Sequence, residues 1–368
     1  METKENGRLP GVRKSNLELF RILTMLLIIA HHYVVNSPLA LPDGPIYSNI
    51  HDFRSVFLLI AGAYGKIGIN CFVFITGYFM CRSGISLRKF LKLYGEVVFY
   101  RIGLFLVFVL MGWEVLSVRN IFVRLLPFRN ISDDFVSCFL AFWLCIPFLN
   151  ILIRGLTEKQ HLCLLGLLLT VYTGLSTLEA TTLRSGVTMN YVSWFSVLYL
   201  IASYLRMYPK AVFERTGLWG WLSALCLVLG AVSVVYCVWF SDGLYAYYFV
   251  ADSNKLLAVV TAFCWFNFFR TLNVPYSRVI NALGGSTFGV LLIHAHSNAM
   301  REWLWVVKLN TVAAYELGAL LPVHILGSVA GVFLVCACID LLRIHLLEKP
   351  LLACYDRWQD RRIKERIR

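Results

Sequence analysis

Charged residues are scarce in this sequence. Of its 368 residues only 15% are charged, 59% are hydrophobic, and the mean hydropathy is +0.69. A soluble domain carries about 25% charged residues. The composition therefore excludes an ordinary soluble protein and indicates a chain that crosses a membrane several times.

The motifs of soluble catalytic and metal sites are also missing. The sequence has no GxSxG nucleophile elbow, no P-loop and no HExxH pair. Its eleven cysteines form no CxxC pair, and most lie inside apolar stretches, so neither disulfides nor a metal site is expected. No repeat, heptad or low-complexity tract occurs, and no small-residue cleavage site follows the first apolar stretch. We expect neither a separate soluble domain nor a cleavable signal peptide.

Basic residues are present, and they gather in short connections between apolar stretches. The net charge of +13 could indicate nucleic-acid binding, but this clustering is typical of cytoplasmic loops, so no nucleic-acid partner is expected. Both tails are basic, and alternate connections carry Arg82, Arg88, Lys89 and Lys92; Arg154 and Lys159; Arg206, Lys210 and Arg215; and Arg270 and Arg278. The positive-inside rule then places both termini in the cytoplasm.

One connection on the opposite side is an exception. It carries Arg119, Arg124 and Arg129 close to Asp133 and Asp134. We interpret these arginines as counter-ions of the two aspartates, with a sugar or anion contact as the alternative.

The fold class that follows is an all-α polytopic bundle of about ten transmembrane helices. The expected spans are residues 15–35, 66–81, 93–113, 135–153, 161–178, 191–207, 218–240, 255–272, 286–307 and 317–342. The apolar segment 53–64 is short, and we expect it to lie at the interface or to enter only part of the bilayer. Residues 1–14 form a cytoplasmic tail, 15–345 the transmembrane domain, and 346–368 a basic cytoplasmic tail.

The first span carries ionisable groups. Arg21 and His32 are eleven residues apart, almost three helical turns, so they share a face and lie about 16 Å apart along the axis. Ionisable groups inside a membrane usually face a bundle interior or a wet cavity, which favours a functional pair. The alternatives are an Arg21 that reaches the headgroups and a His32 that only bridges helices. His31 points about 100° away from this face.

Four further residues are candidates for substrate binding. Glu18 lies one turn before Arg21 and either fixes its rotamer or complements the helix dipole. Asn70 either donates to a substrate or bridges helices. His294 and Arg301 are seven residues apart and would share a face of the ninth span.

An ordered set of segments resembles the bacterial membrane acyltransferase-3 family. ELFRILTMLLIIAHHY resembles its first helix and GKIGINCFVFITGYFM its second. CFLAFWLCIPFLNILI, VLYLIASYLR, STFGVLLIHAH and IDLLR follow in similar form and order, so the resemblance covers residues 15 to 345. The family motif corresponds to Arg21 and His32. The acidic residue of a middle helix in many relatives has no counterpart between Ser137 and Pro147.

The resemblance implies a transferase of the inner (plasma) membrane. Such proteins move an acyl group, commonly acetyl, from cytoplasmic acyl-coenzyme A to a hydroxyl of an extracytoplasmic or lipid-linked carbohydrate. A neutral imidazole suits the base that this reaction needs, so His32 would deprotonate the hydroxyl. Arg21, near the cytoplasmic side, would hold a phosphate of coenzyme A or orient the thioester carbonyl.

A transporter or flippase for a lipid-linked glycan or polysaccharide is the alternative, because a fold alone does not decide function. Transport requires no donor site and no base. The acyl chain, the acceptor sugar and the oligomeric state stay open.

Overall fold

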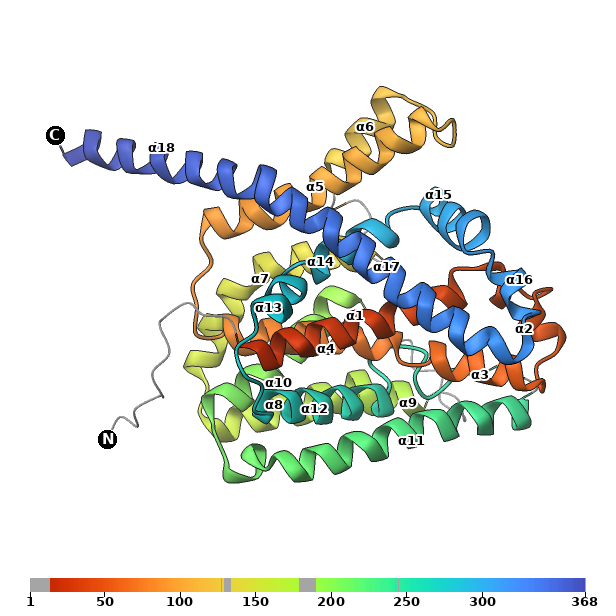
Figure 1. Ribbon diagram of the computed structural model, residues 1–368. Helices are drawn as coiled ribbons and strands as arrows, with labels where there is room; N and C mark the ends of the chain where they lie inside the picture. Colours follow the sequence, from red (N-terminus) through yellow and green to blue (C-terminus); the bar gives the residue numbers. More distant parts are fainter. Residues whose placement is uncertain are drawn as a thin grey trace.

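The computed structural model describes residues 14–126, 128, 134–178, 190–241, 243 and 245–367. Every regular element in these ranges is a helix, which confirms the all-α prediction (Figure 1). The longer helices are α1 (Ser15–Val35), α3 (Phe53–Gly62), α4 (Gly65–Met80), α5 (Leu87–Leu110), α7 (Phe135–Gly155), α8 (Glu158–Leu169), α10 (Tyr191–Met207), α11 (Thr216–Ser241), α12 (Leu256–Thr271), α17 (Leu321–Arg343) and α18 (Lys349–Ile367). Short α-helices are α2 (Pro45–Ser48), α6 (Val118–Leu125), α9 (Ser176–Leu178), α13 (Arg278–Gly285), α14 (Thr287–His294), α15 (Asn298–Arg301) and α16 (Thr311–Tyr315).

Tighter or wider turns connect these elements. The 3₁₀ turns are η1 (Pro38–Ala40), η3 (Ala211–Glu214) and η5 (Gly318–Leu320), and the π-helical segments are η2 (Thr170–Leu175), η4 (Glu302–Lys308) and η6 (Ile344–Glu348).

Seven helical segments within the described residues are long and apolar enough to cross a membrane. They are Ser15–Val35, Phe53–Met80, Leu87–Leu110, Phe135–Gly155, Glu158–Leu178, Thr216–Ser241 and Gly318–Arg362. The chain is therefore a polytopic membrane protein. Of the other three expected spans, two correspond to α10 and α12, which have 17 and 16 residues. The third is the broken segment that begins with α14, so the count of ten crossings stays a prediction.

Segment 53–64 was predicted to be separate from the second span, but the structure joins the two. α3 and α4 follow each other almost without interruption and form one apolar segment of 28 residues, Phe53–Met80. α4 packs closely on α1 because Gly65 has no side chain, and a Cβ there would overlap the ring of His31. This contact holds the end of α1, where both of its histidines lie.

The expected ninth span, 286–307, is not one helix. α14 ends at His294, and the chain starts α15 after Ser297, whose side chain accepts a hydrogen bond from the backbone N–H of Met300. A serine that caps a new helix start competes with continuation of the preceding helix. The break places His294 at a helix end, beside the end of α1.

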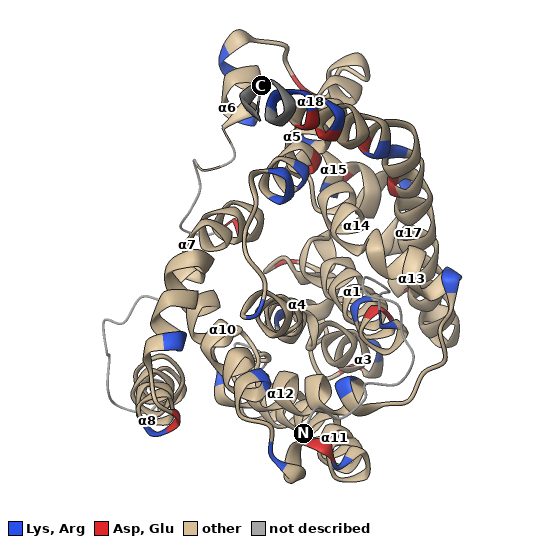
Figure 2. Ribbon diagram, turned by 90° about the vertical axis from the view of Figure 1, so that its left-hand side faces the viewer, with Lys and Arg blue, Asp and Glu red and all other residues tan. Residues whose placement is uncertain are grey.

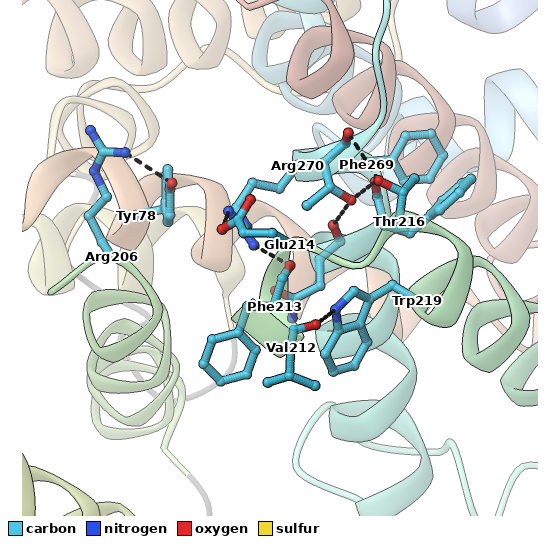
Figure 3. Close-up of polar contacts among 12 residues, drawn as sticks. Tyr78, Arg206, Val212, Phe213, Glu214, Thr216, Trp219, Phe269 and Arg270 are labelled. Carbon is cyan, nitrogen blue, oxygen red and sulfur yellow. Dashed lines mark hydrogen bonds and ion pairs between the residues drawn. The ribbon is translucent and has the colours of Figure 1, made fainter. Parts of the chain in front are cut away.

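The basic loops meet at one end of the bundle. Asn16 donates from Nδ2 to the carbonyls of Phe269 and Arg270, each at 3.0 Å. Arg206 donates to the Tyr78 hydroxyl at 3.0 Å, and Arg270 to Glu214 at 2.8 Å (Figure 3). Figure 2 looks at this end, where α1 begins and α18 ends, with its lysines and arginines in blue. The clustering agrees with the loop side that the charge pattern assigned to the cytoplasm.

A buried polar network joins α5 to α17. Arg343 donates to Asp340 and Glu348, each at 2.8 Å, and lies 3.1 Å from Glu96. Tyr100 adds a hydrogen bond to Asp340 at 2.8 Å. The network explains why Glu96 interrupts an apolar span, since a buried carboxylate needs such partners. Beyond it, the expected basic tail continues as helix α18.

Candidate functional site

Two histidines from helices α1 and α14 are in direct contact. His32 Nδ1 lies 3.0 Å from His294 Nε2, and His294 Nδ1 lies 2.6 Å from the carbonyl oxygen of Val290. His294 is buried, with 1% of its surface exposed. The pair joins residues that are 262 positions apart in the chain.

The hydrogen-bond network assigns the tautomers of the two neutral rings. A carbonyl oxygen only accepts, so Nδ1 of His294 carries a proton and donates to Val290. Nε2 of His294 then has a lone pair and accepts from Nδ1–H of His32. The other ring nitrogen of His32, Nε2, takes no part in these hydrogen bonds and keeps its lone pair. In chemical terms, Nε2 of His32 is set up to accept a proton.

A polar cavity of about 1030 Å³ lies against this pair. We call it the basic cavity, because four cations line it, Lys66, Arg101, Arg124 and Arg301, and one carboxylate, Asp134. His32 itself is part of the lining. The cavity brings together the end of α1, the start of α4, α5, α6, the start of α7 and the residues that follow α14.

Two of the four cations are held by acidic partners. Arg101 donates to Asp134 at 2.7 Å and to Ser137 at 3.2 Å. Arg124 forms an ion pair with Glu114. Arg124 is therefore paired, as the counter-ion interpretation required, but its partner is Glu114 and the partner of Asp134 is Arg101. Arg129 and Asp133, which belong to the same interpretation, lie outside the described residues.

The other candidate of the first span, Arg21, lies elsewhere. Its guanidinium is 3.6 Å from the carboxylate of Glu18, and its side chain is 25% exposed. Glu18 is buried against Gly284 of α13, where a Cβ would overlap the carboxylate. The contact with Arg21 agrees with the prediction that Glu18 fixes its rotamer. Arg21 is not among the residues that line the basic cavity.

Asn70 is fully buried, and both ends of its amide are engaged. Its Nδ2 donates to the carbonyl of Ser253 at 2.6 Å, and its Oδ1 accepts from Trp194 Nε1 at 3.0 Å. This is the geometry of the helix-bridging alternative. A contact with substrate would require at least one of these bonds to open.

Arg301 and His294 do not share a helical face, because α14 ends at His294. The structure nevertheless places both at the site. Arg301 lines the basic cavity, and His294 contacts His32. The physical reason for the prediction was wrong, although the two residues belong to one polar cluster.

His31 is held differently from His32. Its Nδ1 donates to the carbonyl of Gly62 at 2.6 Å, and its ring also lines the cavity. The ring centroids of the two histidines are 5.8 Å apart. Both rings thus have Nδ1 protonated, but only that of His32 is oriented by a second ring.

Sequence reasoning missed much of the cavity lining. Lys66 lies at an expected span boundary, Arg101 lies inside the expected span 93–113, and Tyr247 and His296 give no signal of their own. The one useful signal was the presence of Arg101 inside an apolar stretch, which demands a polar environment.

His294 also lines a second cavity, which is apolar. It has a volume of about 630 Å³ and lies between α5, the α14–η4 region and α17. Its walls include Leu104, Phe108, Trp303 and Val332. Such walls suit hydrocarbon and leave little for a polar ligand to bind.

Comparison with known proteins gives one result. Residues 14–341 match a family model described as an acyltransferase domain. Searches among curated proteins and among solved structures found no match.

Proposed function

Since the chain belongs to the acyltransferase-3 family and is a membrane acyltransferase, we propose that it is an O-acyltransferase of the inner membrane. The donor is cytoplasmic acyl-coenzyme A, with acetyl as the expected group. The acceptor is a hydroxyl of an extracytoplasmic or lipid-linked carbohydrate.

The observation that carries the proposal is the chain of hydrogen bonds from Val290 through His294 to His32. An alcohol attacks a thioester slowly unless a base removes its proton. His32 Nε2 is such a base: it is neutral, its tautomer is fixed, and its ring lines a cavity large enough for a sugar. His294 is a positioning residue that orients the ring of His32.

The reaction balances on these groups. Nε2 of His32 takes the hydroxyl proton while the oxygen bonds to the thioester carbonyl carbon. The tetrahedral intermediate then breaks its carbon–sulfur bond. The thiolate leaves with the proton that His32 returns, and His32 is neutral again.

Arg21 serves the donor in this proposal. Its guanidinium is partly exposed, and in α1 Arg21 follows by five residues Asn16, which bonds to Phe269 and Arg270 at the end where the basic loops meet. A guanidinium binds a phosphate, here one of coenzyme A, through a fixed fork of donors. Glu18, at 3.6 Å, limits the rotamers from which it does so.

The apolar cavity supports a lipid-linked acceptor. His294 lines this cavity and contacts His32, which lines the basic cavity. A sugar in the basic cavity and a hydrocarbon chain in the apolar one would therefore lie on two sides of the same histidine pair.

The test is acylation by variants of the histidines. His32→Ala should abolish detectable transfer, because positioned acid–base groups contribute about 10²- to 10⁴-fold in rate. His32→Gln should not restore it, and His31→Ala should be much milder. His345→Gln is the matched control, since His345 is exposed and does not line the cavity.

The product is measured by mass spectrometry of surface glycans from deletion and complemented strains. An acetyl increment that disappears with the gene identifies both the reaction and the acceptor. A folded His32→Ala protein that acylates at the wild-type rate would refute the base assignment. If the deletion instead stops glycan export without changing acylation, the protein acts as a transporter.

A further inference from the structure

The basic cavity holds two cations that no described carboxylate neutralises. Lys66 donates to the hydroxyl of Tyr191, a neutral partner, at 3.2 Å. Among the described residues, neither Lys66 nor Arg301 has a carboxylate within salt-bridge distance. Arg101 and Arg124, by contrast, have Asp134 and Glu114. The excess positive charge therefore belongs to Lys66 and Arg301.

The same cavity has polar atoms without a partner. Asn36, Tyr247 and His296 line the cavity, and their atoms Asn36 Nδ2, Tyr247 Oη and His296 Nε2 are buried with no hydrogen-bond partner among the described residues. A buried polar group without a partner is costly and calls for a reason. The amide and the hydroxyl are donors, and they suit the hydroxyl and ring oxygens of a sugar.

The cavity also contains the group that reacts. His32 lines it, so a ligand bound there lies beside the proposed base. The part of α1 that lines the cavity is the end distant from Arg21, about 16 Å along the helix. A ligand at this end is the acceptor, if Arg21 serves the donor.

We infer that the basic cavity selects an acceptor that carries a negative charge, a carboxylate or a phosphate. Arg301 and Lys66 bind the anionic group, and Asn36 and Tyr247 hydrogen-bond to the sugar. The inference rests on the proposed function for the identity of the ligand as acceptor. Arg301, which lines the cavity at the end of the short helix α15 and pairs with no described carboxylate, is the principal anion contact.

Binding is tested on the purified full-length protein in detergent by thermal unfolding, independently of catalysis. The probes are glucuronate, glucose 1-phosphate and methyl glucoside, compared at constant ionic strength because salt screens exposed charges. Glucuronate or glucose 1-phosphate should raise Tm, and the uncharged glucoside at equal concentration should not. The better of the two anionic probes identifies carboxylate or phosphate.

Variants then assign the effect to the cavity. In Arg301→Gln the half-maximal concentration of the anionic probe should rise about tenfold or more, the loss expected for one charge-assisted hydrogen bond. Lys66→Gln should act in the same direction, and Arg301→Lys should retain part of the response. Arg119→Gln is the matched control, because Arg119 is exposed and does not line the cavity.

Two further arms separate this inference from the proposed function. His32→Ala should still respond to the anionic probes, since binding does not need the base. The response to acetyl-coenzyme A should survive Arg301→Gln. If Arg301→Gln abolishes that response instead, the cavity binds the donor and the inference is overturned. It is equally overturned if the glucoside binds as well as glucuronate and glucose 1-phosphate.

Discussion

Replacement of His294 by leucine tests whether one histidine orients the other. His294 makes no contact with the reacting atoms in the proposed mechanism. It accepts the Nδ1 proton of His32 at 3.0 Å and is itself fixed by Val290 at 2.6 Å. Leucine removes the acceptor and leaves His32 free to place its proton on either ring nitrogen.

The expected loss has two parts. In serine proteases, where an aspartate orients the catalytic histidine and fixes its tautomer, replacing that aspartate by asparagine costs about 10⁴-fold in kcat. His294→Leu should therefore lower kcat by about 10²- to 10⁴-fold. It also leaves the buried N–H of His32 without a partner, which costs about 1–3 kcal/mol of stability.

The glutamine variant separates orientation from packing. His294→Gln can place a side-chain oxygen near the position of Nε2, so it can still accept from His32. We expect activity in the order wild type, His294→Gln, His294→Leu, with the KM for the donor unchanged in all three. If the role of His294 were purely structural, the activity of both variants would fall equally and in proportion to their loss of Tm.

The assay is single-turnover acyl transfer in detergent, with Tm measured on the same preparations. The reasoning is refuted if His294→Leu is folded and retains the wild-type kcat. It is also refuted if only KM changes, because orientation of a base affects the chemical step.

Other predictions concern the donor, the polar network, the tail and the topology. Arg21→Ala should weaken acyl-coenzyme A binding and Arg21→Lys should retain part of it, as measured by titration. Arg343→Gln leaves buried carboxylates uncompensated and should cost about 3–5 kcal/mol, seen as a lower Tm in detergent. Arg88 of α5 donates to Asp356 of α18 at 2.7 Å, and Asp356→Asn removes this ion pair, so hydrogen exchange of α18 should rise in the variant. Reporter fusions at the two ends of the chain should both report the cytoplasm, and an external signal at either end contradicts the topology.

The spans could be predicted from the sequence because hydropathy is a local property. In α10, for example, the helix covers the expected residues 191–207. The prediction failed where polar side chains occur inside an apolar stretch. The histidine, serine and asparagine that follow Ala295 end α14, but hydropathy averaged over the window hides them.

The site was predictable only along single helices. Periodicity relates Arg21 to His32 because both belong to α1. It contains no information on the contact between His32 and His294, which depends on how α1 and α14 pack. For the same reason the partner of Arg124 was not predicted correctly, since it is Glu114, and nothing in the sequence indicated that Asp134 pairs with Arg101.

The histidine pair lies at the break of the ninth span. The backbone bonding of α14 continues to its end, where the N–H of Ala295 donates to the carbonyl of Leu291 at 3.1 Å. The side chain of His294 adds a bond to the carbonyl of Val290, which has two lone pairs, and its other nitrogen contacts His32. A substitution that favours helix across the break, such as Ser297→Ala, removes the cap of α15 and should cost about 1 kcal/mol. It should also loosen the orientation of His294, so it is expected to lower kcat while the lining of the basic cavity keeps its charge.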